Sequence, residues 1–169
     1  MIRYSIWLMP SGGADALLAA AIAELSRTYD GPSFEPHVTL LGDLLGSEED
    51  VATRTLQLAQ RLRPYEVQLS TPAYLDQYFR CVFLRVRETP LVMEANAQAI
   101  RIFDREDDPP YMPHLSLLYG FFPAALKEQI IAGLSPDLSV RFEATQIHLI
   151  GALSDDPKDW SRILEAPLK

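Results

Sequence analysis

The chain has 169 residues, enough for one large domain or for two small lobes around a shared core. Hydrophobic residues make up 48% of it, which is typical of a packed globule and argues against disorder. Its net charge of −8 and its lack of a basic patch disfavour binding to a long nucleic acid, since such binding depends on lysine and arginine. A small anion held in a local pocket is compatible with this charge.

Signals for a membrane or for secretion are weak. No apolar run approaches the roughly 20 residues that cross a bilayer, so we expect no membrane partner. The apolar start, Met1 to Pro10, predicts a strand rather than a signal peptide, because no small-residue cleavage site follows a long apolar region. Cys81 is the single cysteine, so no internal disulfide can form and a reducing cytoplasm is the expected location. Its apolar neighbours Val82 and Phe83 indicate a buried thiol.

Strand-like and helix-like patterns alternate along the chain. In order, they predict a strand at 3–9, a helix at 14–29, a strand at 34–41, a helix from Ser47 to Pro64, a hairpin of strands at 65–75 and 78–87, a helix at 90–103, a strand at 112–120, a helix at 123–134, and strands at 140–153 and 160–165. Ser47 with Asp50 three residues later resembles a capping box, and Thr89 followed by Pro90 is a typical helix start. This order predicts an α+β protein with mainly antiparallel sheets and outer helices.

One segment occurs twice, as Pro36-His37-Val38-Thr39-Leu40-Leu41 and as Pro113-His114-Leu115-Ser116-Leu117-Leu118. The duplication predicts two related lobes in a bilobal domain over residues 1–169, with two antiparallel sheets that face a central cleft. In a strand, side chains two residues apart share a face and lie roughly 6.6 Å apart. Each copy therefore places its histidine and its hydroxyl on one face. Two such strands side by side would surround one small space with two imidazoles and two hydroxyls.

Two histidines that face one cavity suit acid–base catalysis, because an imidazole with a pKa of about 6.5 can accept or donate a proton near neutrality. On opposite sides of a phosphorus atom, one can deprotonate water while the other protonates the leaving oxygen. Thr39 and Ser116 would donate hydrogen bonds to the non-bridging phosphoryl oxygens. Such a reaction needs no metal or other cofactor. A lone strand histidine is more often structural, but the duplicated pattern is hard to obtain by accident.

Both motifs and the segments around them carry a family resemblance. These segments are Tyr4 to Pro10, Gly31 to Thr39, Cys81 to Leu84, Thr89 to Ala95 and Tyr111 to Tyr119. With them the chain resembles the two-histidine (HxT/S) phosphoesterase superfamily and, within it, the cyclic phosphodiesterases of plant and yeast type. The resemblance covers nearly the whole chain.

The resemblance implies a bilobal fold with a water-filled cleft, and an activity in RNA and tRNA splicing metabolism. The implied reactions open ADP-ribose 1″,2″-cyclic phosphate to the 1″-phosphate and nucleoside 2′,3′-cyclic phosphates to 2′-phosphates. His37 and Thr39 fall on the first family motif, and His114 and Ser116 on the second. We assign His114 as the base that activates water and His37 as the acid, although the two motifs are nearly symmetric.

Three aromatic residues are implied to bind substrate. Tyr119 matches a substrate-contacting tyrosine, but it lies three residues after Ser116, so the strand must end or bend to turn it toward the cleft. Trp7 matches an aromatic that can stack on a base, and Phe79 is placed in the same pocket. From the pattern alone, each of the three could instead be a packing residue.

Other charged and polar residues have less specific interpretations. His148 could complete a three-histidine metal site, but it lacks a companion hydroxyl, and a structural strand histidine is the preferred interpretation. The arginines Arg80, Arg85 and Arg87 are expected on a solvated face, from which one could reach a phosphate.

The leading functional prediction is a monomeric cyclic phosphodiesterase that acts on a small cyclic phosphate, with no long nucleic acid and no membrane as partner. One alternative is an RNA-processing phosphoesterase that acts on 2′,3′-cyclic RNA ends, which the acidic charge disfavours. Another is a non-catalytic nucleotide-binding module. Intact histidine and hydroxyl residues in both copies argue against the last alternative.

Overall fold

A computed structural model describes all residues, 1–169. Its elements in chain order are β1 (Arg3–Leu8), α1 (Gly12–Tyr29), β2 (Val38–Leu44), α2 (Glu48–Ala59), β3 (Tyr65–Tyr74), the 3₁₀ turn η1 (Tyr78–Arg80), β4 (Val82–Val86), α3 (Pro90–Ile102), β5 (His114–Leu118), α4 (Ala124–Gly133), η2 (Pro136–Leu138), β6 (Arg141–Ala144), β7 (Gln146–Ala152), η3 (Pro157–Asp159) and β8 (Trp160–Pro167). The α+β class and the four helices are as predicted. None of the four helices combines the length and the hydrophobicity that a membrane-spanning helix requires.

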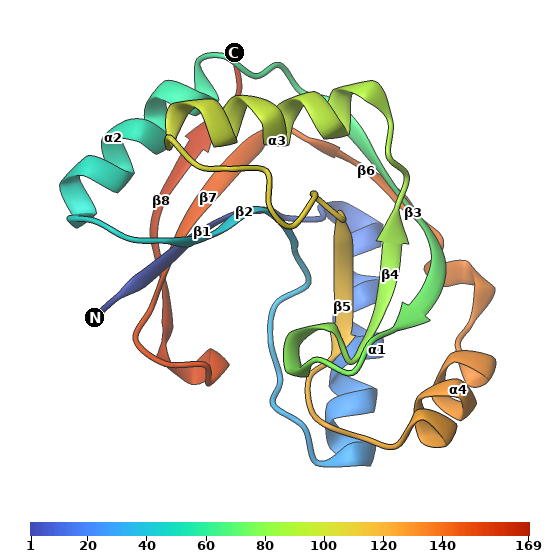
Figure 1. Ribbon diagram of the computed structural model, residues 1–169. Helices are drawn as coiled ribbons and strands as arrows, with labels where there is room; N and C mark the ends of the chain where they lie inside the picture. Colours follow the sequence, from blue (N-terminus) through green and yellow to red (C-terminus); the bar gives the residue numbers. More distant parts are fainter.

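The strands form one antiparallel sheet in the order β6-β3-β4-β5-β2-β1-β7-β8. The sequence predicted two sheets, and the structure joins them at the middle. The junction between β2 and β5 consists of a single residue pair, Val38 opposite Leu115, whereas the neighbouring strand pairs make several. From this junction the sheet divides into two wings, with β1, β2, β7 and β8 in one and β3, β4, β5 and β6 in the other (Figure 1).

Two predicted strands have different bounds in the structure. One is shortened at a proline, and the other is divided where its pairing partner changes. Residues 34–37 are not part of β2, since Pro36 has no N–H to offer to a strand ladder. Residues 140–153 form two strands, because pairing with β3 ends at Ala144, while pairing with β8 begins at Gln146 and pairing with β1 at His148. The apolar alternation changes phase at this point, because Ala144 is followed by the two polar residues Thr145 and Gln146, and the prediction of one continuous strand overlooked this break.

The second strand of the predicted hairpin also begins later than expected. Residues Tyr78 to Arg80 form the turn η1, and β4 starts only at Val82. The carbonyl oxygen of Arg80 accepts a hydrogen bond from the Leu75 N–H at 2.9 Å, which closes the loop between β3 and β4. The prediction that Phe79 lies in a strand is therefore wrong, and this residue lies in a tight turn beside the end of β5.

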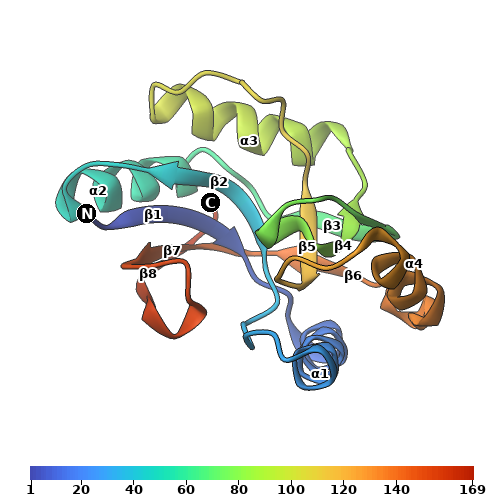
Figure 2. The ribbon, with the colours of Figure 1, turned by 60° about the horizontal axis from the view of Figure 1, so that its bottom comes forward.

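The helices are capped and placed largely as their sequences indicate. Ser47 Oγ accepts from the Asp50 N–H at 3.2 Å, and Thr89 Oγ1 accepts from the Val92 N–H at 3.3 Å. Helices α2 and α3 lie against each other, while α1 and α4 lie toward the opposite end of the molecule (Figures 1 and 2). All four helices bury apolar side chains in a common core on one face of the sheet. The other face is left for the duplicated motifs.

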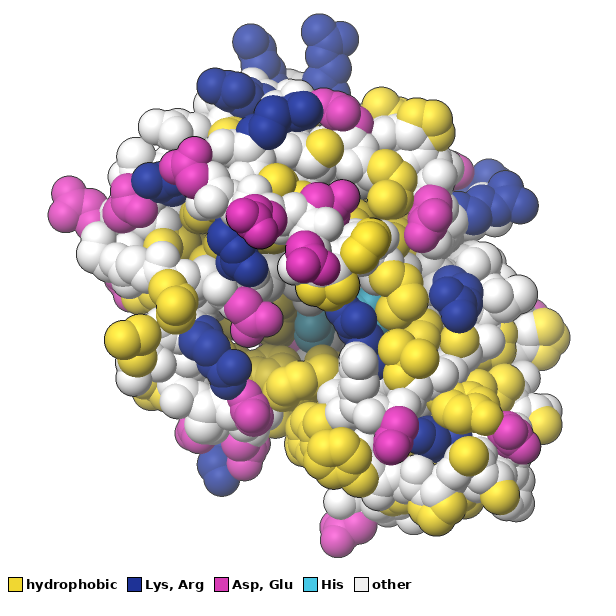
Figure 3. All heavy atoms as spheres, in the orientation of Figure 1, with side chains coloured by type: hydrophobic (Ala, Val, Ile, Leu, Met, Phe, Trp, Pro, Cys, Tyr) yellow, Lys and Arg dark blue, Asp and Glu magenta, His cyan; other side chains and the backbone are white.

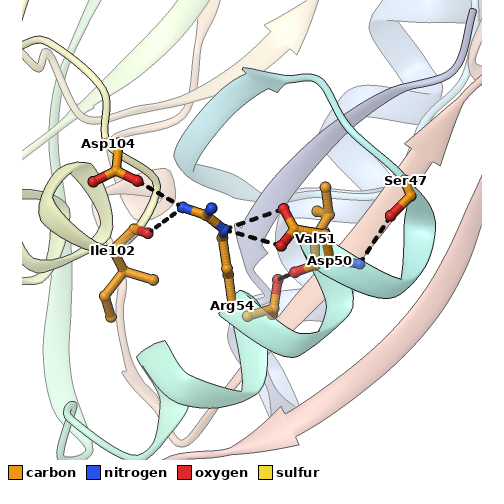
Figure 4. A network of polar contacts seen from close by, with 7 residues as sticks. Ser47, Asp50, Val51, Arg54, Ile102 and Asp104 are labelled. Carbon is orange, nitrogen blue, oxygen red and sulfur yellow. Dashed lines mark hydrogen bonds and ion pairs between the residues drawn. The ribbon is translucent and has the colours of Figure 1, made fainter.

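The segment before the second motif is held by arginines. Arg54 on α2 donates to the Ile102 carbonyl at 2.8 Å at the end of α3, and it pairs with Asp50 and Asp104 (Figure 4). Arg105 donates to the Asp43 carbonyl at 3.0 Å. These contacts fix the start of the loop that leads from α3 to β5.

Candidate active site

The two Pro-His segments meet at the centre of the sheet. Val38 and Leu115 are fully buried in the helix-covered core, so the residues on either side of them face the opposite way. Continued by one residue, the same register sets His37 level with Ser116, and Thr39 level with His114. The structure thus brings together the two imidazoles and two hydroxyls that the sequence predicted. Figure 3 shows histidine atoms inside a hollow on this face, with a cationic side chain beside them.

Both imidazoles are oriented by the same backbone contact. His37 Nδ1 lies 2.7 Å from the Glu35 carbonyl oxygen, and His114 Nδ1 lies 2.9 Å from the Met112 carbonyl oxygen. A carbonyl oxygen can only accept, so Nδ1 carries the proton in each ring and Nε2 is the free nitrogen. In each copy the acceptor lies two residues before the histidine, with a proline of fixed φ between them. This geometry explains why proline is part of the repeated motif.

The environment keeps both imidazoles neutral in the unliganded cleft. Burial lowers the pKa of His37 to about 4; the hydrogen bond to Glu35 partly opposes this shift, and the nearby His114 adds to it. The pKa of His114 is also lowered, first by burial and then by the positive charge of Arg80, against its hydrogen bond to Met112. Burial is thus the largest cause of both shifts, and a nearby ionisable group adds to each, His114 for His37 and Arg80 for His114.

Trp7 lies directly against His37. The two rings are stacked, with centroids 3.5 Å apart and an interplanar angle of 8°, and Trp7 is only 6% exposed. The indole face that contacts His37 is not available to a nucleobase in this structure. Base stacking by Trp7 stays a prediction, while the observed contact fixes the plane of His37.

Tyr119 is turned toward the cleft by the end of its strand, as the sequence required. β5 ends at Leu118, and Tyr119 then stacks on Phe34 with ring centroids 3.8 Å apart. Gly120 follows with a φ of 147°, a conformation that side-chain-bearing residues rarely adopt. Burial, followed by the nearby Tyr78, raises the pKa of Tyr119, so its phenol stays protonated.

Contacts between aromatic rings connect the two wings. Phe79 lies 5.1 Å from Tyr119 and 6.1 Å from Trp160 between ring centroids, and Trp160 lies 5.6 Å from Trp7. Trp160 and Phe34 were missed as site residues. Phe34 lies in a segment that resembles the family, but nothing in the sequence around Trp160 indicates that β8 reaches this cleft.

The two hydroxyls of the motifs differ in their contacts. Ser116 Oγ donates to the Phe79 carbonyl oxygen at 2.6 Å. Thr39 is half-buried, and its hydroxyl makes no hydrogen bond within the protein. A phosphoryl oxygen is an acceptor, so of the two motif hydroxyls only that of Thr39 has a proton that no protein group accepts in this structure.

His148 is placed beside the site but not in a cluster of metal ligands. It is buried opposite Trp7 on the neighbouring strand, and its Nδ1 lies 3.7 Å from a Glu165 carboxylate oxygen. Burial and the nearby Arg162 lower its pKa. No group of three His, Cys, Asp or Glu side chains is arranged to hold a metal ion. Cys81 is buried, as predicted.

Comparison with known proteins identifies the class to which this fold and cleft belong. A model of the 2′-5′ RNA ligase superfamily matches residues 14–156, and the chain belongs to that superfamily. It is 31% identical over 117 residues to a cyclic phosphodiesterase of Arabidopsis thaliana, an alignment that covers 69% of this chain and 65% of the plant protein.

Solved structures share the fold at low sequence identity. E. coli LigT, crystallised with 3′-AMP, matches with a TM-score of 0.68 and 18% identity, over 99% of this chain and 98% of LigT. The protein TT0787 of Thermus thermophilus matches with a TM-score of 0.68 and 18% identity, over 98% of this chain and 97% of TT0787.

Proposed function

We propose that this protein is a metal-independent cyclic phosphodiesterase that hydrolyses small ribose cyclic phosphates. The observation that carries the proposal is the pair of imidazoles His37 and His114, each held by Nδ1 and each with a free Nε2, at the junction of the two wings. Similarity to a plant cyclic phosphodiesterase supports the same reaction class. The substrates we propose are ADP-ribose 1″,2″-cyclic phosphate and nucleoside 2′,3′-cyclic phosphates, opened to the 1″-phosphate and to 2′-phosphates.

In the proposed reaction, the base takes a proton from water as the water oxygen bonds to phosphorus. The ring P–O bond breaks, and the acid protonates the ribose oxygen that leaves. The two histidines together therefore gain one proton and lose one. General acid–base catalysis of this kind contributes about 10²–10⁴-fold per group. We retain His114 as base and His37 as acid. Since the pKa of free His37 is about 4, that assignment requires the bound phosphate anion to raise it.

A product assay tests the proposal most simply. The protein, with EDTA present, is incubated with ADP-ribose 1″,2″-cyclic phosphate and with the four nucleoside 2′,3′-cyclic phosphates, and the products are identified by ³¹P NMR. We expect 1″- and 2′-phosphates. Loss of turnover on chelation would refute metal independence, and 3′-phosphate products would refute the regiochemistry.

An RNA-processing enzyme is the second candidate, because the chain belongs to a superfamily named for RNA ligation and E. coli LigT was crystallised with a nucleotide. An RNA with a 2′,3′-cyclic end, compared with the cyclic mononucleotide, separates the two candidates. We expect the mononucleotide to be preferred, in keeping with the net charge of −8. Binding of a 2′-nucleotide without any turnover would instead favour the non-catalytic module.

The proposal also includes a monomer in a reducing cytoplasm, in keeping with the single buried Cys81. Light scattering should give the mass of one chain, and a stable dimer would refute the monomer.

A further inference from the structure

We propose that Tyr111 is a positioning residue for the catalytic site, because its phenol bonds to the backbone of Thr39 and so fixes the first motif relative to the second. The inference deepens the proposed function and rests on it for the reaction that Tyr111 affects. The bond itself, and the sparse strand pairing that it supplements, are features of the structure.

The two motifs are joined by very little backbone pairing. β2 and β5 share the single residue pair Val38 and Leu115, whereas β5 pairs with β4 from His114 to Leu118. One residue pair cannot by itself fix the angle between two strands. Thr39 and His114 are level on either side of this junction, so the distance between them must depend on further contacts.

Tyr111 supplies a further contact across the junction. Its hydroxyl donates to the Thr39 carbonyl oxygen at 2.8 Å, one residue after the paired Val38. The residue that follows Tyr111, Met112, provides the carbonyl oxygen that lies 2.9 Å from His114 Nδ1. Two consecutive residues of one segment therefore hold one motif each, Tyr111 the first and Met112 the second.

The pairing of the first motif with β1 is also interrupted beside Thr39. β1 pairs with Thr39 and with Leu41 but not with Leu40, which forms a β-bulge. The Leu40 carbonyl instead accepts from Asn96 Nδ2 of α3 at 2.8 Å, and both residues are buried. The side chains of Asn96 and Tyr111 thus hold two consecutive carbonyl groups of the motif where regular strand pairing is broken.

The Tyr111 hydroxyl keeps its proton over the whole working range of the enzyme. Tyr111 packs against the apolar core, and burial, followed by the nearby Tyr65, raises the pKa of its phenol. The phenol therefore remains a donor at any pH at which the two histidines titrate. Such a fixed bond matters in a preorganised site, because misplacement of a group by about 1 Å can lower a rate by about 10²-fold.

Tyr65 supplies a matched control. It is a buried tyrosine of the same core, on β3, and its hydroxyl has no hydrogen-bond partner within the protein. Replacement of either tyrosine by phenylalanine removes one hydroxyl and keeps the ring, but only the Tyr111 variant also removes a bond to a motif. Loss of the Tyr65 hydroxyl should not destabilise the protein, since a buried hydroxyl without a partner is unfavourable.

The test measures turnover of a nucleoside 2′,3′-cyclic phosphate and binding of inorganic phosphate by ³¹P NMR titration, with circular dichroism to confirm that each variant is folded. For Tyr111→Phe we expect kcat lower by about 10-fold and the phosphate Kd higher by about 3-fold, because the Thr39 hydroxyl is displaced from the phosphoryl oxygens. Tyr65→Phe should change both by less than about 2-fold, since it breaks no hydrogen bond. Unchanged kcat in Tyr111→Phe, or an equal loss in Tyr65→Phe, overturns the proposal.

Thr39→Ala shows whether Tyr111 acts through Thr39. If it does, the double variant Thr39→Ala/Tyr111→Phe should lose less than about 2-fold in kcat beyond Thr39→Ala alone. A general structural loss would multiply with that of Thr39→Ala, and this result overturns the positioning role. If the wild type opens no cyclic phosphate, the proposed function fails and phosphate binding decides: weaker binding in Tyr111→Phe than in Tyr65→Phe supports the positioning role, and equal binding overturns it.

Discussion

At the scale of single residues, the site is organised by contacts that fix each imidazole. His37 is fixed by the Glu35 carbonyl on one ring nitrogen and by Trp7 on one ring face. Glu35 is in turn paired through its carboxylate with Arg162 on β8, at 2.6 Å. The position of His37 therefore depends on β8, a strand that is distant from His37 in the sequence.

The pH dependence of the reaction follows from the two lowered pKa values. For kcat/KM, which reports the free enzyme, we expect a bell-shaped profile centred on the acid side of 6.5, because burial disfavours the charged form of both histidines. For kcat, both limbs should move to higher pH, since the bound phosphate anion favours the charged form. Initial rates across pH 4 to 8 test this expectation. A kcat/KM optimum above pH 7 would contradict it.

The stacking of Trp7 on His37 leads to a prediction about specificity. If Trp7 acts on His37, Trp7→Leu should lower kcat by a similar factor for a nucleoside 2′,3′-cyclic phosphate and for a ribose cyclic phosphate that has no base. If Trp7 instead stacks on a base, KM should rise for the nucleotide alone. Steady-state kinetics on the two substrates distinguishes these outcomes, and we expect the first.

At the scale of elements, the segment from the end of β5 to α4 connects the motif to the turn η1. Gly120 is central, because its N–H binds the Tyr78 carbonyl and its φ is 147°. A Cβ added there would lie 2.6 Å from a ring carbon of Phe122. This spacing leaves no room for a side chain without movement of the turn.

Gly120→Ala should therefore lower the free energy of unfolding by about 1–3 kcal/mol and reduce turnover, because strained backbone conformations carry costs of this order. Gly13→Ala is the control, since its added Cβ would meet nothing within 4 Å on helix α1 and alanine favours helix. Urea unfolding and kinetics on both variants test the prediction. Equal stabilities for the two variants would count against it.

Helices and strands were predicted well where local sequence signals exist. They were predicted poorly where pairing between distant strands determines the boundaries. The caps at Ser47 and Thr89 place the starts of α2 and α3, and the repeated motif places the site. Sequence could not show which strands pair on either side of Thr145, nor that Trp160 reaches the cleft, because both depend on contacts between distant segments. The occupied hydroxyl of Ser116 is likewise visible only once η1 is seen beside β5.

At the scale of the whole molecule, the cleft is a source of pH-dependent stability. The pKa of His37 falls from 6.5 to about 4 on folding, so between these values the unfolded chain binds a proton that the folded protein does not. The stabilising contribution is complete above pH 6.5 and is lost as the pH falls toward 4. It amounts to on the order of 3 kcal/mol.

We expect the free energy of unfolding to decline more steeply with acid in the wild type than in His37→Gln, which cannot titrate at this position. Urea denaturation at several pH values between 7 and 4 gives the free energy of unfolding against pH for each protein. The carboxylates contribute equally to both curves, so subtracting one curve from the other removes their contribution. Parallel curves would mean that His37 is not desolvated in the folded protein.

The central claim is that His37 and His114 act as one catalytic unit. Its most direct test is the turnover of a nucleoside 2′,3′-cyclic phosphate, in EDTA, by wild type, His37→Ala, His114→Ala and the double variant, with circular dichroism to confirm that each is folded. The account predicts that each single variant loses at least about 10²-fold in kcat and that the double variant loses little more, because neither group works without the other. A folded single variant with near-wild-type activity, or losses that multiply in the double variant, would contradict it.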